Sequence, residues 1–227
     1  DPFNYPEQYT DASEISYIPE NMPHKVSLGR FNKEKNSMYY GCISKSIKNS
    51  NVAFSETDAK ENEYINVLVS YTKMELKVRY IGLFDYYKRG TVAPFSVHSL
   101  FEDIDKYYQV THEEELLSAI ELCDAFFFDI TTRKGHDRLY RVTSILSSIF
   151  LEDKHVDGLI YPSVETIGSP NVVLKPASVD EKVLHKEVRI FLIEKNYGYS
   201  LYRAMDSYPI GLINSQNYIS WGNLNDN

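Results

Sequence analysis

The sequence predicts a single domain of the α+β class, with a mixed, largely antiparallel sheet and flanking helices. A chain of 227 residues is long enough to bury a core of its own. Strand-like runs precede and follow a central stretch with helical periodicity, which is typical of α+β proteins. Residues 1–25 hold four of the nine prolines, so we expect an extended N-terminal arm there and the domain over residues 26–227.

The first elements of the domain are expected to be a strand and a helix. Met38 to Ser44 is a short strand candidate. Asn51 can cap a helix from about Val52 to Asn62, and acidic residues enrich this run. Glu56 would then lie early on the helix.

Two apolar, β-branched runs come next, Tyr64 to Tyr71 and Leu76 to Phe84. They are separated by Thr72-Lys73, and the pattern predicts a β-hairpin. Two more strands are expected near the end of the chain, over Asn171 to Leu174 and Val183 to Glu194.

The middle of the chain has helical periodicity. Ser99 to Gln109 predicts one helix, and the capping-box pattern from Thr111 to Glu114 predicts the start of another. A third helix is expected from about His136 to Leu151, with one apolar face formed by Leu139, Val142, Ile145, Leu146 and Ile149.

A short strand ends at a polar residue after this helical region. Asp157-Gly158 is a turn signal, and Leu159 to Tyr161 predicts the strand. Pro162 has no N–H donor and ends the strand, which leaves Ser163 at its tip.

Composition excludes several classes of function. The net charge of −8 gives no positive field to attract nucleic acid or anionic lipid, so we expect neither as a partner. No run approaches the roughly 20 apolar residues of a membrane span. Only Cys42 and Cys123 are present, too few for a disulfide framework, and this indicates a cytoplasmic protein.

The common catalytic signatures are missing from the sequence. Neither a GxGxxG nor a Walker phosphate loop occurs. The six histidines have no metal-binding spacing, so no metal site is expected. No serine lies in a GxSxG motif, which argues against an α/β-hydrolase.

Arg30, Glu56 and Ser163 each lie in a short apolar and aromatic frame. Each also has an ordinary structural explanation: a surface salt bridge for Arg30, a partner of the helix dipole for Glu56 and a turn residue for Ser163. Taken together, a guanidinium, a carboxylate and a hydroxyl predict a pocket for a ligand that carries phosphate and sugar.

Six motifs over about residues 25 to 175 follow the order of the RES domain, a family of NAD-destroying bacterial toxins named for arginine, glutamate and serine. They are Arg30-Phe31-Asn32, Met38-Tyr39-Tyr40-Gly41, Glu56, Tyr140-Arg141-Val142-Thr143, Asp157 to Ser163, and Asn171-Val172-Val173-Leu174. On these motifs the chain resembles a RES domain, and Asp157 to Ser163 is the most specific of them.

The resemblance implies an ADP-ribosyltransferase-like fold that takes NAD as substrate and breaks the bond between nicotinamide and ribose. Arg30, Glu56 and Ser163 would be catalytic, and Phe31 and Tyr39 would also contact NAD. Tyr39 and Tyr40 are neighbours in a predicted strand and point to opposite faces, and the family pattern selects Tyr39.

The resemblance also implies a setting and partners: a toxin–antitoxin or anti-phage defence system, with an antitoxin or regulatory protein as partner. The acceptor stays open between phosphorolysis, with inorganic phosphate bound, and hydrolysis. Two other functions also stay open. One is a protein ADP-ribosyltransferase, and the other is a catalytically silent nucleotide-binding module.

Overall fold

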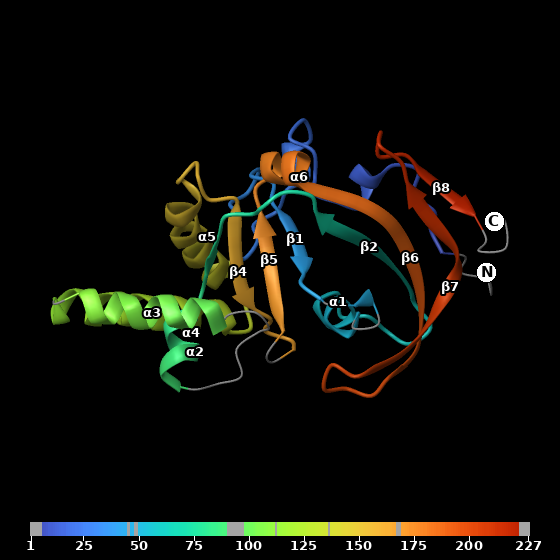
Figure 1. Ribbon diagram of the computed structural model, residues 1–227. Helices are drawn as coiled ribbons and strands as arrows, with labels where there is room; N and C mark the ends of the chain where they lie inside the picture. Colours follow the sequence, from blue (N-terminus) through green and yellow to red (C-terminus); the bar gives the residue numbers. More distant parts are fainter. Residues whose placement is uncertain are drawn as a thin grey trace.

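Two four-stranded sheets with different strand orders form the framework of the protein (Figure 1). The computed structural model describes residues 6–222, except residues 45, 48–49, 90–97, 112, 136 and 167–168. The first sheet has the order β1-β5-β4-β3, and the second has the order β2-β6-β7-β8. Helices flank the first sheet, so the fold belongs to the α+β class.

The first sheet is mixed and carries the main core. It contains β1 (Tyr39–Cys42), β3 (Val78–Tyr80), β4 (Gly158–Pro162) and β5 (Pro170–Leu174). β4 runs parallel to β3, while β5 runs antiparallel to β4 and β1. On the face toward the helices the core comprises Phe31, Ile81, Phe127, Ile130, Leu159, Tyr161 and Val173.

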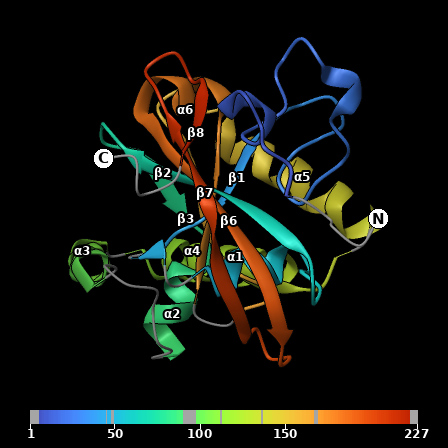
Figure 2. The same cartoon turned by 90° about the vertical axis from the view of Figure 1, so that its right-hand side faces the viewer.

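The second sheet is antiparallel throughout. It contains β2 (Tyr64–Thr72), β6 (Val183–Asn196), β7 (Tyr202–Ile213) and β8 (Ile219–Gly222). Figure 2 views the molecule from the side of this sheet. The mixed, largely antiparallel character expected from the sequence is present, but it is divided between two sheets.

The predicted hairpin between Tyr64 and Phe84 is wrong. β2 pairs with β6 in the second sheet, and β3 pairs with β4 in the first. The chain between them is held by distant residues: Lys73 N donates to Lys182 O, and Lys77 N donates to the Asp157 carboxylate. These bonds lead the chain from one sheet to the other instead of back along β2.

Six α-helices lie among the described residues: α1 (Asn51–Glu56), α2 (Leu83–Arg89), α3 (His98–Val110), α4 (Glu114–Thr132), α5 (Asp137–Leu151) and α6 (Pro176–Lys182). The helices expected in the middle of the chain are confirmed as α3, α4 and α5. α4 begins without the expected capping box, because its N-cap is Glu113 and has no side-chain cap bond. His112, within the predicted capping box, and His136, at the predicted start of the third helix, lie outside the described residues.

The face that α5 turns to the core differs from the prediction. Val142, Ile145 and Ile149 are about half exposed or more, at 47%, 55% and 61%. Leu139 and Leu146 pack on the core as expected, together with Phe150. Between them lie the small residues Thr143, Ser144 and Ser147, which let the helix approach closely, and Ser147 Oγ donates to Phe31 O at 3.2 Å.

α1 is shorter than predicted, and this changes the setting of Glu56. The helix ends at Glu56, so this residue lies at its C-terminal end and not near its start. Asp58 has a φ of 51°, and Ala59 N donates back to Phe54 O at 2.9 Å. The left-handed residue ends the helix, because it turns the chain away from the helix axis.

Described residues of the N-terminal segment lie against the second sheet. Asp11 forms a bridge with Tyr218, and Ile219 N donates to Thr10 O at 2.9 Å. The segment contains two short 3-10 helices, Ala12–Glu14 and Pro23–Lys25, while the first five residues of the expected arm lie outside the described residues. No helix in the described part of the chain has the length and apolar character needed to cross a membrane.

Candidate functional site

The carboxylate of Glu56 gathers donors from two places in the first sheet. Glu56 Oε1 accepts a hydrogen bond from Ser163 Oγ at 2.6 Å and one from Asn171 Nδ2 at 2.7 Å. Glu56 ends α1, Ser163 follows β4, and Asn171 belongs to β5. Both bonds use Oε1, and Glu56 is exposed, so Oε2 is available to a ligand.

Ser163 is held as an oriented donor. Its backbone N–H donates to Ser169 O at 2.8 Å, and its hydroxyl accepts from Thr166 N at 2.9 Å. The hydroxyl hydrogen is therefore directed at Glu56. No histidine bonds to this hydroxyl among the described residues, so the common Ser–His pair of a serine nucleophile is not formed there. Ser163 is thus suited to positioning.

Asn171 carries a buried acceptor that has no partner among the described residues. The residue is 2% exposed, and its Oδ1 makes no hydrogen bond there. The amide orientation follows from its neighbour, because a carboxylate only accepts and so Nδ2 must face Glu56. The Thr166 hydroxyl, in the loop after Ser163, is also buried without a partner in the described part of the chain. Both atoms are shielded from solvent, so in this arrangement they are not open to a ligand.

Arg30 is held at the C-terminal end of α4. Its Nη1 donates to Thr131 O and to Arg133 O, the latter at 3.0 Å, and its guanidinium lies 5.3 Å from the centre of the Tyr140 ring. A cation is favourable there, because carbonyls at a helix C-terminus have no partners within the helix. Arg30 thus has a structural role, and the bonds to the described residues use only one of its three nitrogens.

Phe31 and Tyr40 fix the segment that carries Arg30. Phe31 is 2% exposed and packs on Tyr161 with ring centres 4.4 Å apart, so its ring belongs to the core and has little surface for the predicted contact with a ligand. Tyr40 OH donates to Asn32 Oδ1 at 2.8 Å and accepts from Phe31 N at 3.0 Å. Tyr40, and not Tyr39, is therefore the β1 tyrosine on the side of Arg30.

Tyr39 points to the other face of the first sheet. It lines a cavity of about 630 Å³ between the two sheets, with Ser70 and Val172 among its neighbours. The pKa of Tyr39 is raised by burial, which a bond with the Ser70 hydroxyl partly offsets. Tyr39, which the family pattern selects, therefore faces the cavity between the sheets. The first sheet separates it from the side that carries Arg30.

Tyr161 lies near both Arg30 and Glu56. Burial raises the pKa of its hydroxyl far above the ordinary range; nearby Tyr40 and the negative charge of Glu56 add to the rise, and the positive charge of Arg30 opposes it. Tyr161 therefore stays neutral and feels both charges. It pairs with Asn171 across β4 and β5, and Ser163 lies two residues further along the chain.

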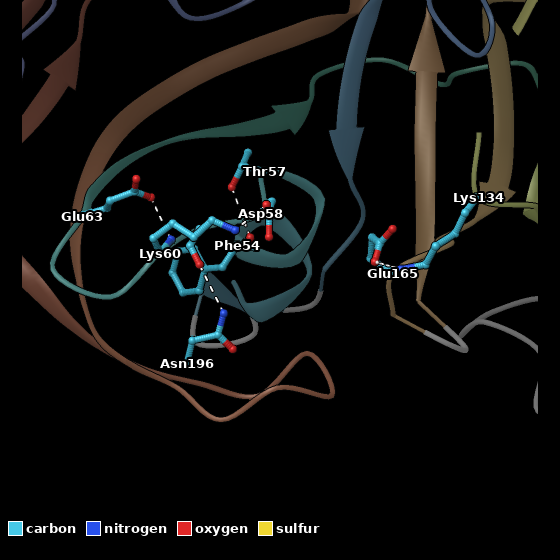
Figure 3. Close-up of polar contacts among 9 residues, drawn as sticks. Phe54, Thr57, Asp58, Lys60, Glu63, Lys134, Glu165 and Asn196 are labelled. Atoms are coloured by element: carbon cyan, nitrogen blue, oxygen red, sulfur yellow. Dashed lines mark hydrogen bonds and ion pairs between the residues drawn. The ribbon is translucent and has the colours of Figure 1, made fainter. Parts of the chain in front are cut away.

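The loop after Ser163 is tied to neighbouring segments. Lys134 Nζ lies 3.0 Å from Glu165 Oε2, an ion pair that joins the loop to the connection between α4 and α5 (Figure 3). Ser200 Oγ, in the connection between β6 and β7, donates to Glu165 O at 2.6 Å.

Other reactive groups near the site are inert or absent. Burial, with a smaller effect from the charge of Glu56, raises the pKa of the Cys42 thiol to about 12, so the thiolate nucleophile is not formed near neutral pH. Within the described ranges, no three His, Cys, Asp or Glu side chains converge in a way that could hold a metal ion.

One feature of the sequence distinguishes Asn171. Asparagine is depleted in strands, and this one opens the apolar run Asn171-Val172-Val173-Leu174.

Compared with known proteins, the chain matches no protein-family profile, no curated protein and no solved structure.

Proposed function

We propose that this protein cleaves the bond between nicotinamide and ribose in NAD. The observation that carries the proposal is the Glu56 cluster: one carboxylate oxygen held by Ser163 and Asn171, and the second oxygen available. Carboxylates are suitable acceptors for the hydroxyls of a ribose.

The chemistry of the reaction fits these groups. The N-glycosidic bond breaks with its electron pair moving to the nicotinamide nitrogen, which turns the pyridinium into a neutral ring. No general acid is needed for this leaving group. The ribose becomes positively charged in the transition state, and a fixed negative charge such as that of Glu56 stabilises it.

Arg30 is the proposed contact for the pyrophosphate of NAD or for an incoming inorganic phosphate. Its guanidinium keeps Nε and Nη2 for a ligand, because its hydrogen bonds to the described residues use Nη1. Arginine binds phosphate oxygens with two parallel hydrogen bonds. This local charge would hold an anion on a chain whose net charge is −8.

The acceptor of the ribosyl group defines the reaction. An oxygen of phosphate, or of water with loss of a proton, would form the new bond to the ribose carbon. An NAD-degrading enzyme of this kind would act as a toxin or defence effector, under the control of a regulatory protein. A protein side chain as acceptor would make it a transferase instead.

The test is to incubate the purified protein with NAD, with and without inorganic phosphate, and to identify the products. We expect free nicotinamide, and faster loss of NAD with a phosphorylated ADP-ribose as product when phosphate is present. Plain ADP-ribose at a rate indifferent to phosphate would define a hydrolase. Labelled protein would define a transferase, and NAD binding without turnover would define a silent module.

A further inference from the structure

The connection between β6 and β7 presents a cluster of apolar side chains to solvent. Tyr197, Tyr199 and Leu201 are 55%, 97% and 56% exposed. Tyr199 is thus the most exposed of the large apolar side chains in the described ranges. A tyrosine without packing partners at the end of a hairpin needs an explanation, because burying its ring would be favourable.

The backbone of this tip adopts a conformation that bulky residues avoid. Gly198, Tyr199 and Ser200 all have positive φ, at 75°, 53° and 59°. The turn is closed by Leu201 N, which donates to Gly198 O at 2.9 Å, and by Tyr197 N, which donates to Leu201 O at 3.0 Å. Positive φ at both Tyr199 and Ser200 is the geometry of a tight type I′ hairpin turn, so Tyr199 lies at the centre of the turn and its ring is presented to solvent.

The hairpin is anchored to the segment that follows Glu56. Asn196 Nδ2 donates to Ala59 O at 3.3 Å, as Figure 3 shows, and Asn196 N donates to Glu61 Oε1 at 3.1 Å. Next to it, Tyr202 packs on Phe54 of α1 with ring centres 5.7 Å apart. The base of the tip therefore has a fixed position relative to the end of α1.

The tip is also anchored to the loop that follows Ser163. Ser200 Oγ donates to Glu165 O at 2.6 Å, and the next residue, Thr166, bonds to Ser163 Oγ. In Figure 1 the hairpin passes below α1 toward the lower ends of β4 and β5. Tyr199 thus lies on a bridge between the two chain segments that supply Glu56 and Ser163.

We infer that Tyr199 is a stacking platform for a planar, aromatic base of the ligand that Glu56 and Ser163 bind. This rests on the function proposed above, in which the ligand is a dinucleotide with a base at each end. The cluster at Glu56 binds the ribose beside the reacting bond, and the tip binds the distant adenine. A tyrosine ring offers a flat apolar face with few rotatable bonds, which suits a base.

The test compares two ligands that differ in the adenine half. Affinities are measured for a non-cleavable carbocyclic analogue of NAD and for the corresponding analogue of nicotinamide mononucleotide. We expect Tyr199→Ala to weaken binding of the NAD analogue about 5- to 150-fold, because stacking on a base is worth about 1–3 kcal/mol. Binding of the mononucleotide analogue should not change.

Two variants serve as controls. Tyr199→Phe keeps the ring and should bind the NAD analogue like the wild type. Tyr218→Ala removes another exposed tyrosine, 56% exposed, beside β8, and should also leave the affinity for the NAD analogue unchanged. An unchanged affinity of Tyr199→Ala, or an equal loss for both ligands, would overturn the inference and leave the proposed function standing. A wild-type protein that binds neither ligand would overturn both.

Discussion

At the scale of single residues, the Glu56 carboxylate is held in a fixed position and is also exposed. Ser163 and Asn171 bind the same oxygen, Oε1, and so set the plane of the carboxylate. The side chain remains exposed although it reaches two buried partners. In the proposed reaction, a charge held this way would need little reorganisation when a positive ribose forms next to it.

Replacing Glu56 should remove the charge and keep the structure. In Glu56→Gln the amide oxygen can still accept from Ser163 and Asn171, so folding should survive. We expect NAD turnover to fall roughly 100-fold or more, the scale seen when one electrostatic stabiliser of a transition state is lost. Steady-state rates of nicotinamide release measure this effect, and a thermal melt checks the fold.

Glu75→Gln is the matched control, because Glu75 is an exposed carboxylate in the connection between β2 and β3. It should keep wild-type turnover. Near-normal turnover of a folded Glu56→Gln protein would contradict the assignment of Glu56.

At the scale of elements, the start of β4 is fixed by a buried ionic cluster. Lys182 Nζ donates to both oxygens of Asp157 at 2.9 Å, Lys77 N donates to Oδ2 at 2.6 Å, and Ser178 Oγ donates to Oδ1 at 2.8 Å. The next residue must be glycine, because a Cβ at Gly158 would lie 2.0 Å from Val173 O. The most specific part of the family-like motif therefore builds the strand that ends at Ser163.

Asp157→Asn should destabilise the fold and make the stability of the fold depend less on pH. Burial alone would raise the pKa of Asp157, but the bonds from Lys182, Lys77 and Ser178 outweigh it and lower the pKa. The unfolded chain then binds the proton more readily, so the stabilisation is complete above the ordinary pKa of about 4 and is lost as the pH falls through the lower folded value.

Urea unfolding at neutral and acidic pH measures this prediction. We expect Asp157→Asn to lose about 3 kcal/mol at neutral pH, because it leaves the Lys182 ammonium without its charged partner, and to lose less at acidic pH. Asp58→Asn, whose ion pair with Lys60 is largely exposed, is the control and should change little. An equal loss at both pH values would show that the charge of Asp157 is not the cause.

At the scale of the whole molecule, residues from distant parts of the chain surround one tyrosine. Tyr161 feels the charge of Arg30 from one side and that of Glu56 from another, and Phe31 packs on its ring. The second sheet adds the β6–β7 hairpin, tied to the loop after Ser163. The proposed site therefore depends on how the first sheet, the end of α4 and the second sheet are assembled.

A double-mutant cycle tests whether Arg30 and Ser163 serve one ligand. Arg30→Lys keeps the charge but loses the planar fork, and Ser163→Ala removes the hydroxyl that holds Glu56. Affinity for the non-cleavable NAD analogue is measured for the wild type, both single variants and the double variant. We expect the effects to differ from additivity by about 0.5 kcal/mol or more, because residues that bind one ligand couple energetically.

The exposed Arg138 of α5 gives the comparison for this cycle. Arg138→Lys should combine additively with Ser163→Ala. Fully additive losses for Arg30→Lys and Ser163→Ala would separate Arg30 from the site and restrict it to its structural role at the end of α4.

The sequence by itself determined those features that depend on neighbours along the chain. Helical periodicity predicted α3, α4 and α5, because side chains three and four positions apart share a face. The apolar run from Leu159 predicted β4, and Ser163 follows the strand as expected, although Pro162 itself pairs with Pro170 as the last residue of β4. These signals are local, and distant parts of the fold did not override them.

Only the tertiary structure decided the features that depend on distant partners. The pairing of β2 with β6 and the core face of α5 each follow from contacts with remote residues. The same holds for the side of β1 on which Tyr40 meets Asn32, and for the bond between Asn171 and Glu56. A strand or helix pattern defines two faces but not what covers each, because packing and hydrogen bonds across the fold make that choice.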